Sequence, residues 1–142
     1  MRHRLASTVL FTALLSSGAY AYDNTEAKVV VTPLARTTAT AAGQPIALPQ
    51  GDAEVIVSMF EIPPGASLPV HQHPFPRYAY VLGGTLQVAN VETGEKKTYK
   101  AGDFIVEMVS LWHQGANIGT EPVKLLVIDQ VEQGQPTTIV RE

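Results

Sequence analysis

The fold is decided by the segment Gly65-Ala-Ser-Leu-Pro-Val-His71-Gln-His73-Pro-Phe-Pro-Arg77-Tyr-Ala-Tyr-Val-Leu-Gly-Gly84. Its apolar and β-branched residues are interrupted by Gly and Pro, which is typical of short strands joined by turns. Side chains two residues apart on a strand face the same side, so His71 and His73 can converge on one ion. Because imidazole is a common ligand of transition metals, this spacing indicates a metal site.

The chain on both sides of this segment also reads as β-structure. No stretch beyond residue 22 repeats apolar positions with a helical period. The expected strands are Lys28–Thr32, Glu54–Ile62, Tyr78–Leu82, Thr85–Val91, Lys96–Tyr99, Phe104–Glu107, Trp112–Ala116, Val123–Val131 and Thr137–Val140. A hairpin is expected around Thr93-Gly94, and Thr37–Gly43 is a weak strand or a loop. Many short, regularly spaced strands predict one all-β domain, a sandwich or a barrel, over residues 22–142.

A second segment, Gly102-Asp-Phe-Ile-Val-Glu107-Met-Val-Ser-Leu-Trp-His113-Gln-Gly-Ala-Asn117, completes a pattern with the first. Together they resemble the two motifs of the cupin superfamily, G-x5-H-x-H-x3/4-E-x6-G and G-x5-P-x-G-x2-H-x3-N. The glycine and histidine spacings of the first motif are all kept. The second keeps Gly102, His113 and Asn117 but has Met108 and Ser110 where the family has Pro and Gly.

The resemblance implies a jelly-roll β-barrel of six or more strands, often dimeric, with a divalent transition metal inside. In the family the ion is held by the residues equivalent to His71, His73 and His113, and usually by the glutamate of the first motif. Gly65 and Gly102 would lie in tight turns, where a positive φ favours glycine. Asn117 would support a turn or the mouth of the barrel rather than take part in catalysis.

Arg77 stands at the glutamate position of the first motif. Arginine is permanently charged and cannot ligate a metal. Strand parity places Arg77 on the same face as His71 and His73, whereas Tyr78 and Tyr80 alternate away, toward the other sheet or a second subunit. A guanidinium about 5 Å from a dication would repel it by about 7 kcal/mol at an effective dielectric of 20. Either an anion intervenes, or Arg77 swings away, or no metal binds.

Glu107 is the internal acid that bears on this question, because it interrupts an otherwise apolar run six residues before His113. An acid in such a run is seldom buried without a partner. Three hypotheses remain open. Glu107 replaces the missing ligand, or it pairs with Arg77 and leaves a three-histidine site, or it points outward from a half-exposed strand.

Composition excludes several classes of function. The chain has 142 residues, a net charge of −3, no cysteine and four histidines. The weak acidic balance argues against nucleic-acid binding, which usually needs a clustered basic excess. The missing cysteines exclude disulfides, thiolate zinc sites and cysteine nucleophiles. A Ser-His-Asp triad is not credible, because the histidines are already claimed by the metal site.

Residues 1–21 read as a cleavable secretory signal peptide. Arg2 and Arg4 form a positive region, Leu5–Leu15 an apolar run too short to span a bilayer, and Ala19-Tyr20-Ala21 a cleavage site. We therefore expect an exported protein, periplasmic or secreted, with no stable membrane anchor after cleavage. Its histidines would then be His71, His73 and His113 alone.

The sequence thus predicts an exported metal-binding cupin that acts on a small molecule in the barrel, as an oxygenase or isomerase. The metal ligands would be His71, His73, His113 and, as a fourth, Glu107, with Zn, Mn, Fe, Ni or Cu as the ion. Arg77 would orient the substrate anion bidentately. The alternative is a non-catalytic module that binds a sugar or carboxylate, or that handles the metal itself. In either case we expect a homodimer.

Overall fold

Alternation of apolar and polar residues shapes this chain into strands, because alternate side chains of a strand point to opposite faces. The structure, a computed structural model, describes residues 28–142, and within that range it has nine strands and no helix. These are β1 (Ala53–Ile62), β2 (His71–Gln72), β3 (Arg77–Gly83), β4 (Thr85–Asn90), β5 (Lys96–Lys100), β6 (Phe104–Val106), β7 (His113–Asn117), β8 (Val123–Glu132) and β9 (Ile139–Val140). Residues Thr32–Glu142 form one compact unit.

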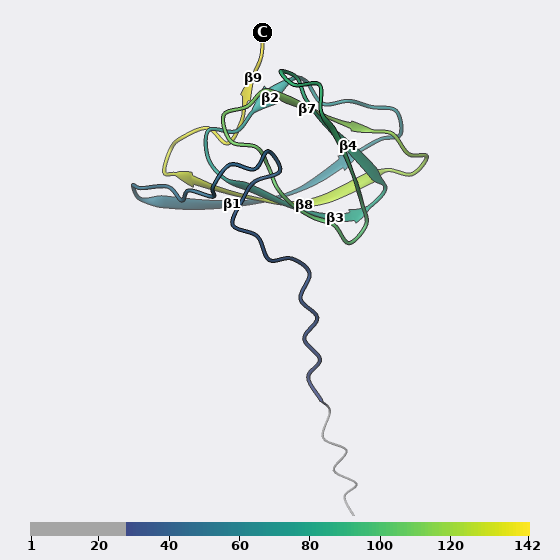
Figure 1. Cartoon of the computed structure of the whole chain (residues 1–142), viewed down its shortest axis with the longest axis horizontal. Helices are drawn as coiled ribbons and strands as arrows, with labels where there is room; N and C mark the ends of the chain where they lie inside the picture. The colour runs from purple at the N-terminus through teal and green to yellow at the C-terminus, as the bar shows by residue number, and fades with distance from the viewer. Residues whose placement is uncertain (1–27) are drawn as a thin grey trace, which may run out of the picture. The chain divides into compact units, whose positions relative to one another are not determined.

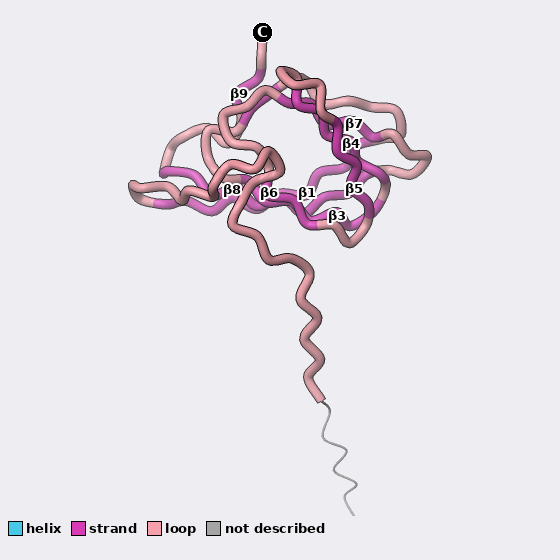
Figure 2. Tube along the Cα trace, in the orientation of Figure 1, coloured by secondary structure: helices cyan, strands magenta, loops and turns pink. Residues whose placement is uncertain are grey.

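The strands form two antiparallel sheets that face one another. One has four strands in the order β1-β8-β3-β6, and the other has five in the order β5-β4-β7-β2-β9. In Figure 1 the β1, β8 and β3 strands form the lower layer and β2, β7 and β4 the upper one, and Figure 2 shows the same two layers with the loops between them. The predicted all-β jelly-roll fold is therefore confirmed.

The core lies between the sheets and is built from small and medium aliphatic side chains. In β8 every second residue points inward, so that Val123, Leu125, Val127 and Val131 are almost fully buried. The core also contains residues from β1, β3, β4 and β6 and from the segment after β6: Ile62, Ala79, Val81, Leu86, Val88, Ile105 and Met108. The inward series of β8 is broken at one position only, by Asp129, which is 3% exposed. Because burying an unpaired acid is costly, Asp129 must have a cation or hydrogen-bond donor as its partner.

Four positions of the two sequence motifs, three glycines and one serine, have a positive φ. Gly65 and Gly102 have φ of 75° and 96°, as expected. Gly84 has φ of 79°, and a Cβ there would lie 2.6 Å from the carbonyl oxygen of Pro122, so only glycine fits. Ser110, which replaces a family glycine, keeps the left-handed conformation at φ 54°, the only non-glycine residue among 28–142 to do so.

Two expectations about the strands are wrong. Lys28–Thr32 forms no strand, and its valines are 82–90% exposed, because β-propensity alone does not form a strand without a neighbour to pair with. The histidine pair and Arg77 do not share one strand either. The β2 strand ends at Gln72, and the chain crosses through Pro74-Phe75-Pro76 to the opposite sheet, where β3 begins at Arg77. Arg77 still faces the interior, because the inward faces of the two sheets meet there.

The predicted signal peptide, residues 1–21, lies outside the described residues. In the described part of the chain, no helix has the length and apolar character needed to cross a membrane.

Candidate metal centre

The three histidines come together at one end of the five-stranded sheet. His71 in β2 lies directly opposite His113 in β7, and His73 follows just after the end of β2. Their ring centroids are 4.5 to 5.0 Å apart. All three side chains are buried, with residue exposures of 6% or less. Side chains that the sequence separates by forty residues therefore share one small space inside the sandwich.

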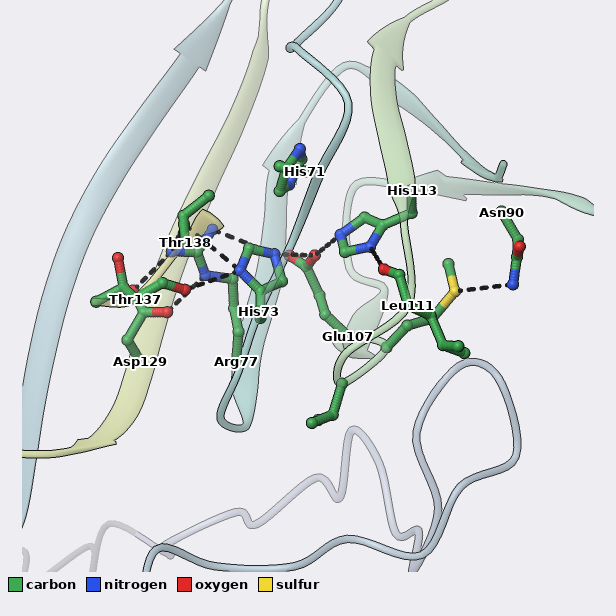
Figure 3. Close-up of polar contacts among 12 residues, drawn as sticks. His71, His73, Arg77, Asn90, Glu107, Leu111, His113, Asp129, Thr137 and Thr138 are labelled. Atoms are coloured by element: carbon green, nitrogen blue, oxygen red, sulfur yellow. Dashed lines mark hydrogen bonds and ion pairs between the residues drawn. The ribbon is translucent and has the colours of Figure 1, made fainter. Parts of the chain in front are cut away.

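Glu107 reaches this space from the opposite sheet. It follows β6, and its backbone N–H donates to the carbonyl oxygen of Arg77 at 2.9 Å, which continues the β3–β6 pairing. Its Oε2 lies 3.2 Å from Nε2 of His73 and 3.2 Å from Nε2 of His113. The side chain is 15% exposed. Figure 3 shows the carboxylate of Glu107 pointing at the histidines, so the outward orientation is excluded.

The backbone fixes which nitrogen of each imidazole faces the centre. Nδ1 of His71 donates to the carbonyl oxygen of Pro69 at 2.8 Å, Nδ1 of His113 donates to that of Leu111 at 2.8 Å, and Nδ1 of His73 donates to that of Thr137 at 3.0 Å. A carbonyl oxygen only accepts, so each Nδ1 carries a hydrogen. In the neutral ring the lone pair is then on Nε2, which is the atom a metal requires.

The resulting group of donors matches a metal ion. Neutral imidazoles offer three Nε2 lone pairs, and an ionised Glu107 offers only acceptor oxygens, so acceptors face acceptors unless a proton or a cation lies between them. The four donor atoms lie within 4.8 Å of one another. Ligands about 2.1 Å from an ion are separated by about 3.0 to 4.2 Å, so shifts of a few tenths of an ångström complete the shell. The residues present therefore fit a divalent transition metal.

The charge states of two members agree with this donor set. Burial, followed by the neighbouring His113 and His73, lowers the pKa of His71 from 6.5 to about 4, so this imidazole is neutral at pH 7. Burial alone raises the pKa of Glu107, but hydrogen bonds from His113 and His73 and the charge of Arg77 outweigh burial and hold the pKa well below its usual range. The carboxylate is thus ionised, and a proton or a bound cation between it and the imidazole nitrogens would supply the stabilisation.

Arg77 belongs to a second polar cluster beside the first. Its Nε donates to Oδ1 of Asp129 at 2.6 Å and its Nη2 to Oδ2 of the same carboxylate at 3.0 Å, a bidentate ion pair with side-chain exposures of 7% and 4%. Nη2 also donates to Oγ1 of Thr138 at 3.1 Å. Its Nη1 lies 3.4 Å from Nε2 of His73. Asp129 therefore neutralises the guanidinium that would otherwise repel a nearby cation.

The C-terminal segment holds both clusters in place. The β9 strand pairs with the two-residue β2, and the N–H of Arg141 donates to the carbonyl oxygen of Val70 at 2.9 Å. Thr137 supplies the carbonyl that orients His73, and Thr138 supplies the hydroxyl that Arg77 contacts. Because β2 is so short, this segment is a main support of the His71-x-His73 pair.

The space around the centre is small and mostly apolar. A cavity of about 20 Å³, room for about one water molecule, is lined by His71, His113, Glu107 and Arg77 together with aliphatic side chains such as Leu125 and Val127. A hollow of about 140 Å³ outside it is lined by Phe60, Leu68, Pro69, His71, Arg77 and Thr138. Drug-sized ligands occupy roughly 300 Å³ or more, so the hollow suits a molecule of only a few heavy atoms.

The structure thus brings together His71, His73, His113 and Glu107, and places Arg77 next to them. Arg77 pairs with Asp129 rather than with Glu107, and its bidentate face is occupied, so a substrate anion could reach only Nη1. Sequence reasoning missed Asp129. This acid interrupts the apolar run Val123–Val131, which is the same kind of signal that drew attention to Glu107. Nothing in the sequence pointed to Thr138.

Comparison with known proteins agrees with this geometry. The Cupin domain family matches residues 58–129, which is half of the chain. The chain belongs to the cupin family. The match includes both sheets' central strands, His71, His73, Glu107 and His113, and it ends at Asp129. No protein of curated function matches the sequence.

Several solved cupin structures share the fold. Oxalate decarboxylase of Lactobacillus farciminis, in a formate complex, is 26% identical over 61% of this chain and 26% of its own, with a TM-score of 0.50. Oxalate decarboxylase of Bacillus subtilis is 24% identical over 61% and 23%, also with a TM-score of 0.50, and has Mn(II) centres. The polyketide cyclase RemF of Streptomyces resistomycificus is 20% identical over 66% and 65%, with a TM-score of 0.53. The chain therefore spans only about a quarter of the decarboxylases and about two thirds of the cyclase.

Proposed function

We propose that this cupin binds one divalent transition-metal ion through Nε2 of His71, His73 and His113 and the carboxylate of Glu107, and acts on a small molecule beside the ion. One observation carries the proposal. Three imidazoles, each fixed through Nδ1 by a backbone carbonyl, and the carboxylate of Glu107 place four potential ligand atoms within 4.8 Å of one another. A hydrogen bond from the outer nitrogen of an imidazole to a backbone carbonyl orients the ring and strengthens metal binding. Zn, Mn, Fe, Ni and Cu all accept this donor set.

A bound ion would supply Lewis-acid or redox chemistry at an open coordination position. The chain's own residues would hold and orient the reactant. Phe60 and Leu68 line the outer hollow and exclude water from one side of it. Nη1 of Arg77, 3.4 Å from Nε2 of His73, is the part of the guanidinium left to meet an anion. We therefore propose a small anionic substrate and a reaction of the oxygenase or isomerase type.

The comparisons support small-molecule chemistry in such a barrel. The L. farciminis decarboxylase structure contains formate, and the B. subtilis enzyme contains Mn(II). These ligands were found in those proteins and not in this one. The proposal is supported in this chain by the hollow of about 140 Å³, which is large enough for a molecule the size of formate.

We also propose that the protein is exported, periplasmic or secreted, after removal of residues 1–21, and that it is a homodimer. Export rests on the signal-peptide pattern of the sequence. A periplasmic extract that contains a chain beginning at Tyr22, established by N-terminal sequencing, is the expected result. Full-length protein confined to the cytoplasm contradicts it.

Metal analysis tests the central proposal. Protein purified without chelators and without a nickel-affinity step is expected to carry about one ion per chain by elemental analysis. Azide added to the cobalt- or iron-loaded protein is expected to change its visible spectrum, because a small anion enters next to Arg77. Protein that contains far less than one ion per chain, and that takes up none of the five metals when they are added, would overturn the proposal.

A non-catalytic role is the second candidate, favoured by one observation. Asp129 neutralises Arg77 and occupies its bidentate face, so the charged group best suited to a substrate carboxylate is already used. The cupin would then bind a small sugar or carboxylate, or simply handle the metal. Full metal loading with no spectral response to azide or to small carboxylates is the result expected for metal handling, and it distinguishes this role from catalysis.

A further inference from the structure

The turn that follows Glu107 is strained and lacks the two residues that stiffen it in the family. Met108 and Ser110 stand at the proline and glycine positions of the second motif. Proline fixes the backbone, and glycine adopts a positive φ without strain. Ser110 instead has a φ of 54°, a conformation that costs a non-glycine residue free energy and persists only where its surroundings enforce it. Other contacts must therefore hold this turn in shape.

Three of the four proposed metal ligands depend on this turn. Glu107 directly precedes it. The N–H of Ser110 donates to the carbonyl oxygen of His73 at 2.8 Å. The carbonyl oxygen of Leu111 accepts from Nδ1 of His113 at 2.8 Å, and Figure 3 shows Leu111 and Glu107 meeting this imidazole at its two nitrogens. A shift of the turn would therefore move these three ligands relative to one another.

The side chain of Gln44 holds the middle of the turn, although it lies 65 residues earlier in the chain than Val109. Its Nε2 donates to the carbonyl oxygen of Val109 at 2.8 Å, and its Oε1 accepts from the N–H of Val109 at 3.1 Å. A residue of a neighbouring antiparallel strand would exchange the same two hydrogen bonds with Val109. Val109 also forms a parallel bridge with His73. The amide of Gln44 thus takes the place of a strand beside the turn.

Gln44 is itself fixed by a small hairpin, residues 38–46, in which the N–H of Ile46 donates to the carbonyl oxygen of Thr38 at 3.1 Å. The hydroxyl of Thr40, a buried residue, donates to Oε1 of Gln44 at 3.1 Å. Oε1 therefore accepts two hydrogens, one from Thr40 and one from Val109, which uses both of its lone pairs. The orientation of the amide is thus set within the hairpin, before it meets the turn.

A second contact of the same hairpin lies on the other side of Glu107. The N–H of Ala41 donates to the carbonyl oxygen of Val106 at 2.7 Å. Together with the bonds between Gln44 and Val109, this contact holds the chain one residue before Glu107 and two residues after it. Ligand side chains need such support, because a metal site tolerates displacements of only about 0.5 Å.

We infer that Gln44 is a positioning residue of the metal centre: through the backbone of Val109 it keeps the turn after Glu107 in the shape that metal binding requires. This inference rests on the metal site of the proposed function and adds to it a residue that lies before the matched cupin domain, residues 58–129. The hairpin of residues 38–46 supplies the restraint that the proline and glycine of the second motif would otherwise supply.

Cobalt titration of Gln44→Ala tests the inference. Metal affinity is expected to fall about tenfold, the lower end of the effect of losing an outer partner. The visible spectrum of the cobalt-loaded protein is expected to change, because Glu107 shifts. Gln50→Ala is the matched control, since the amide of Gln50 also donates to a backbone carbonyl, that of Leu48, but at an exposed position. It is expected to keep the wild-type affinity and spectrum. Wild-type values in Gln44→Ala would overturn the inference.

Relief of the strain at Ser110 separates positioning from a general structural role. Glycine adopts the positive φ without strain, so Ser110→Gly in the Gln44→Ala background is expected to restore most of the affinity and the wild-type cobalt spectrum. Circular dichroism reports folding of each variant. A folded double variant in which neither the affinity nor the spectrum recovers overturns the inference.

Amide hydrogen exchange measures the turn in the metal-free protein. The N–H of Ser110 donates to His73 and not to Gln44, so it reports the turn itself. In Gln44→Ala its exchange is expected to be at least about tenfold faster, while amides of β8, which is paired on both sides, keep their wild-type rates. Equal acceleration at Ser110 and throughout β8 would indicate general destabilisation and overturn the inference.

Failure of the proposed metal site and failure of this inference are distinguishable. A wild type that takes up no metal overturns the proposed site. A wild type that binds metal, with a Gln44→Ala variant of equal affinity, overturns the role of Gln44 alone.

Discussion

Two polar clusters lie side by side within one apolar sandwich, and they are built on opposite principles. The Arg77–Asp129–Thr138 cluster is complete: its guanidinium and carboxylate neutralise each other through two hydrogen bonds, and a hydroxyl accepts a third. The His71–His73–His113–Glu107 cluster is incomplete, since its inward-facing atoms are all acceptors once the imidazoles are neutral. Buried polar groups are stable only when paired, so the second cluster needs a proton or a cation between its members and the first does not.

The difference shows that the two acids, Asp129 and Glu107, have different roles. Asp129 is a buried carboxylate and Glu107 a mostly buried one, yet Asp129 faces a permanent cation of the chain and Glu107 faces the nitrogens of two histidines. The family's glutamate position is occupied by Arg77, and Glu107 supplies a carboxylate from the neighbouring strand instead. Asp129 then compensates the charge that this exchange introduces. Variants of the two acids are therefore expected to fail in different ways.

Glu107→Gln is expected to have the largest effect. The amide keeps the size of the side chain but removes the negative charge, and loss of even an outer partner costs about 10 to 100-fold in metal affinity. We expect metal affinity to fall by more than about 100-fold in calorimetric titration, with circular dichroism to check that the metal-free variant is folded. Glu92→Gln, the same change at an exposed position, is the control and leaves the affinity unchanged. Equal affinities for wild type and Glu107→Gln would remove Glu107 from the site.

The sequence predicts some features of the histidine cluster and not others. The histidine spacings located all three imidazoles, because ligand geometry restricts both separation and strand parity. The fold class followed from the same motifs. The path of the chain between His73 and Arg77 could not be predicted from the motifs. Assigning side chains to alternate faces assumes one continuous strand, whereas the chain changes sheets there. The orientation of Glu107 needed the β3–β6 register, which joins segments about thirty residues apart. Thr138 carries no local signal, because only the return of β9 to β2 brings it close.

Asp129→Asn is expected to lower the stability of the metal-free fold and, because Arg77 is then uncompensated, to weaken metal binding as well, though less than Glu107→Gln does. Removing one partner of a buried ion pair leaves the other charge unpaired and costs about 3 kcal/mol of unfolding free energy. Urea unfolding of the metal-free protein measures this loss. The double variant Arg77→Met with Asp129→Leu removes both charges and is expected to recover most of it. Glu61→Gln, at the exposed pair with Lys124, is the control and should have little effect. A double variant as unstable as Asp129→Asn would show that the pair is not the cause.

Acidification is expected to act on the histidine cluster through His71 and Glu107. The pKa of His71 is about 4 in the fold and 6.5 unfolded, so the unfolded chain binds more protons between these values and stability falls as the pH drops below about 6.5. Glu107, whose pKa is also lowered in the fold, adds a further loss below about 4.5. Urea midpoints of the metal-free protein across this range measure the slope. His71→Gln is expected to flatten it between pH 6.5 and 4, and an unchanged slope would contradict this assignment.

Thr138→Val is expected to have the smallest effect, and it tests whether the two clusters act as one. The Oγ1 of Thr138 accepts from Arg77 and lies 3.5 Å from Nδ1 of His73, so it touches both. Valine keeps the shape and removes one hydrogen bond, which costs about 1 kcal/mol of unfolding free energy. Arg77 keeps both bonds to Asp129, and His73 keeps its bond to the carbonyl of Thr137. Metal affinity should therefore change less than about tenfold, and Thr138→Ser should restore the wild-type stability. A loss of metal affinity as large as that of Glu107→Gln would mean instead that the complete cluster positions the incomplete one, with Thr138 as the link between them.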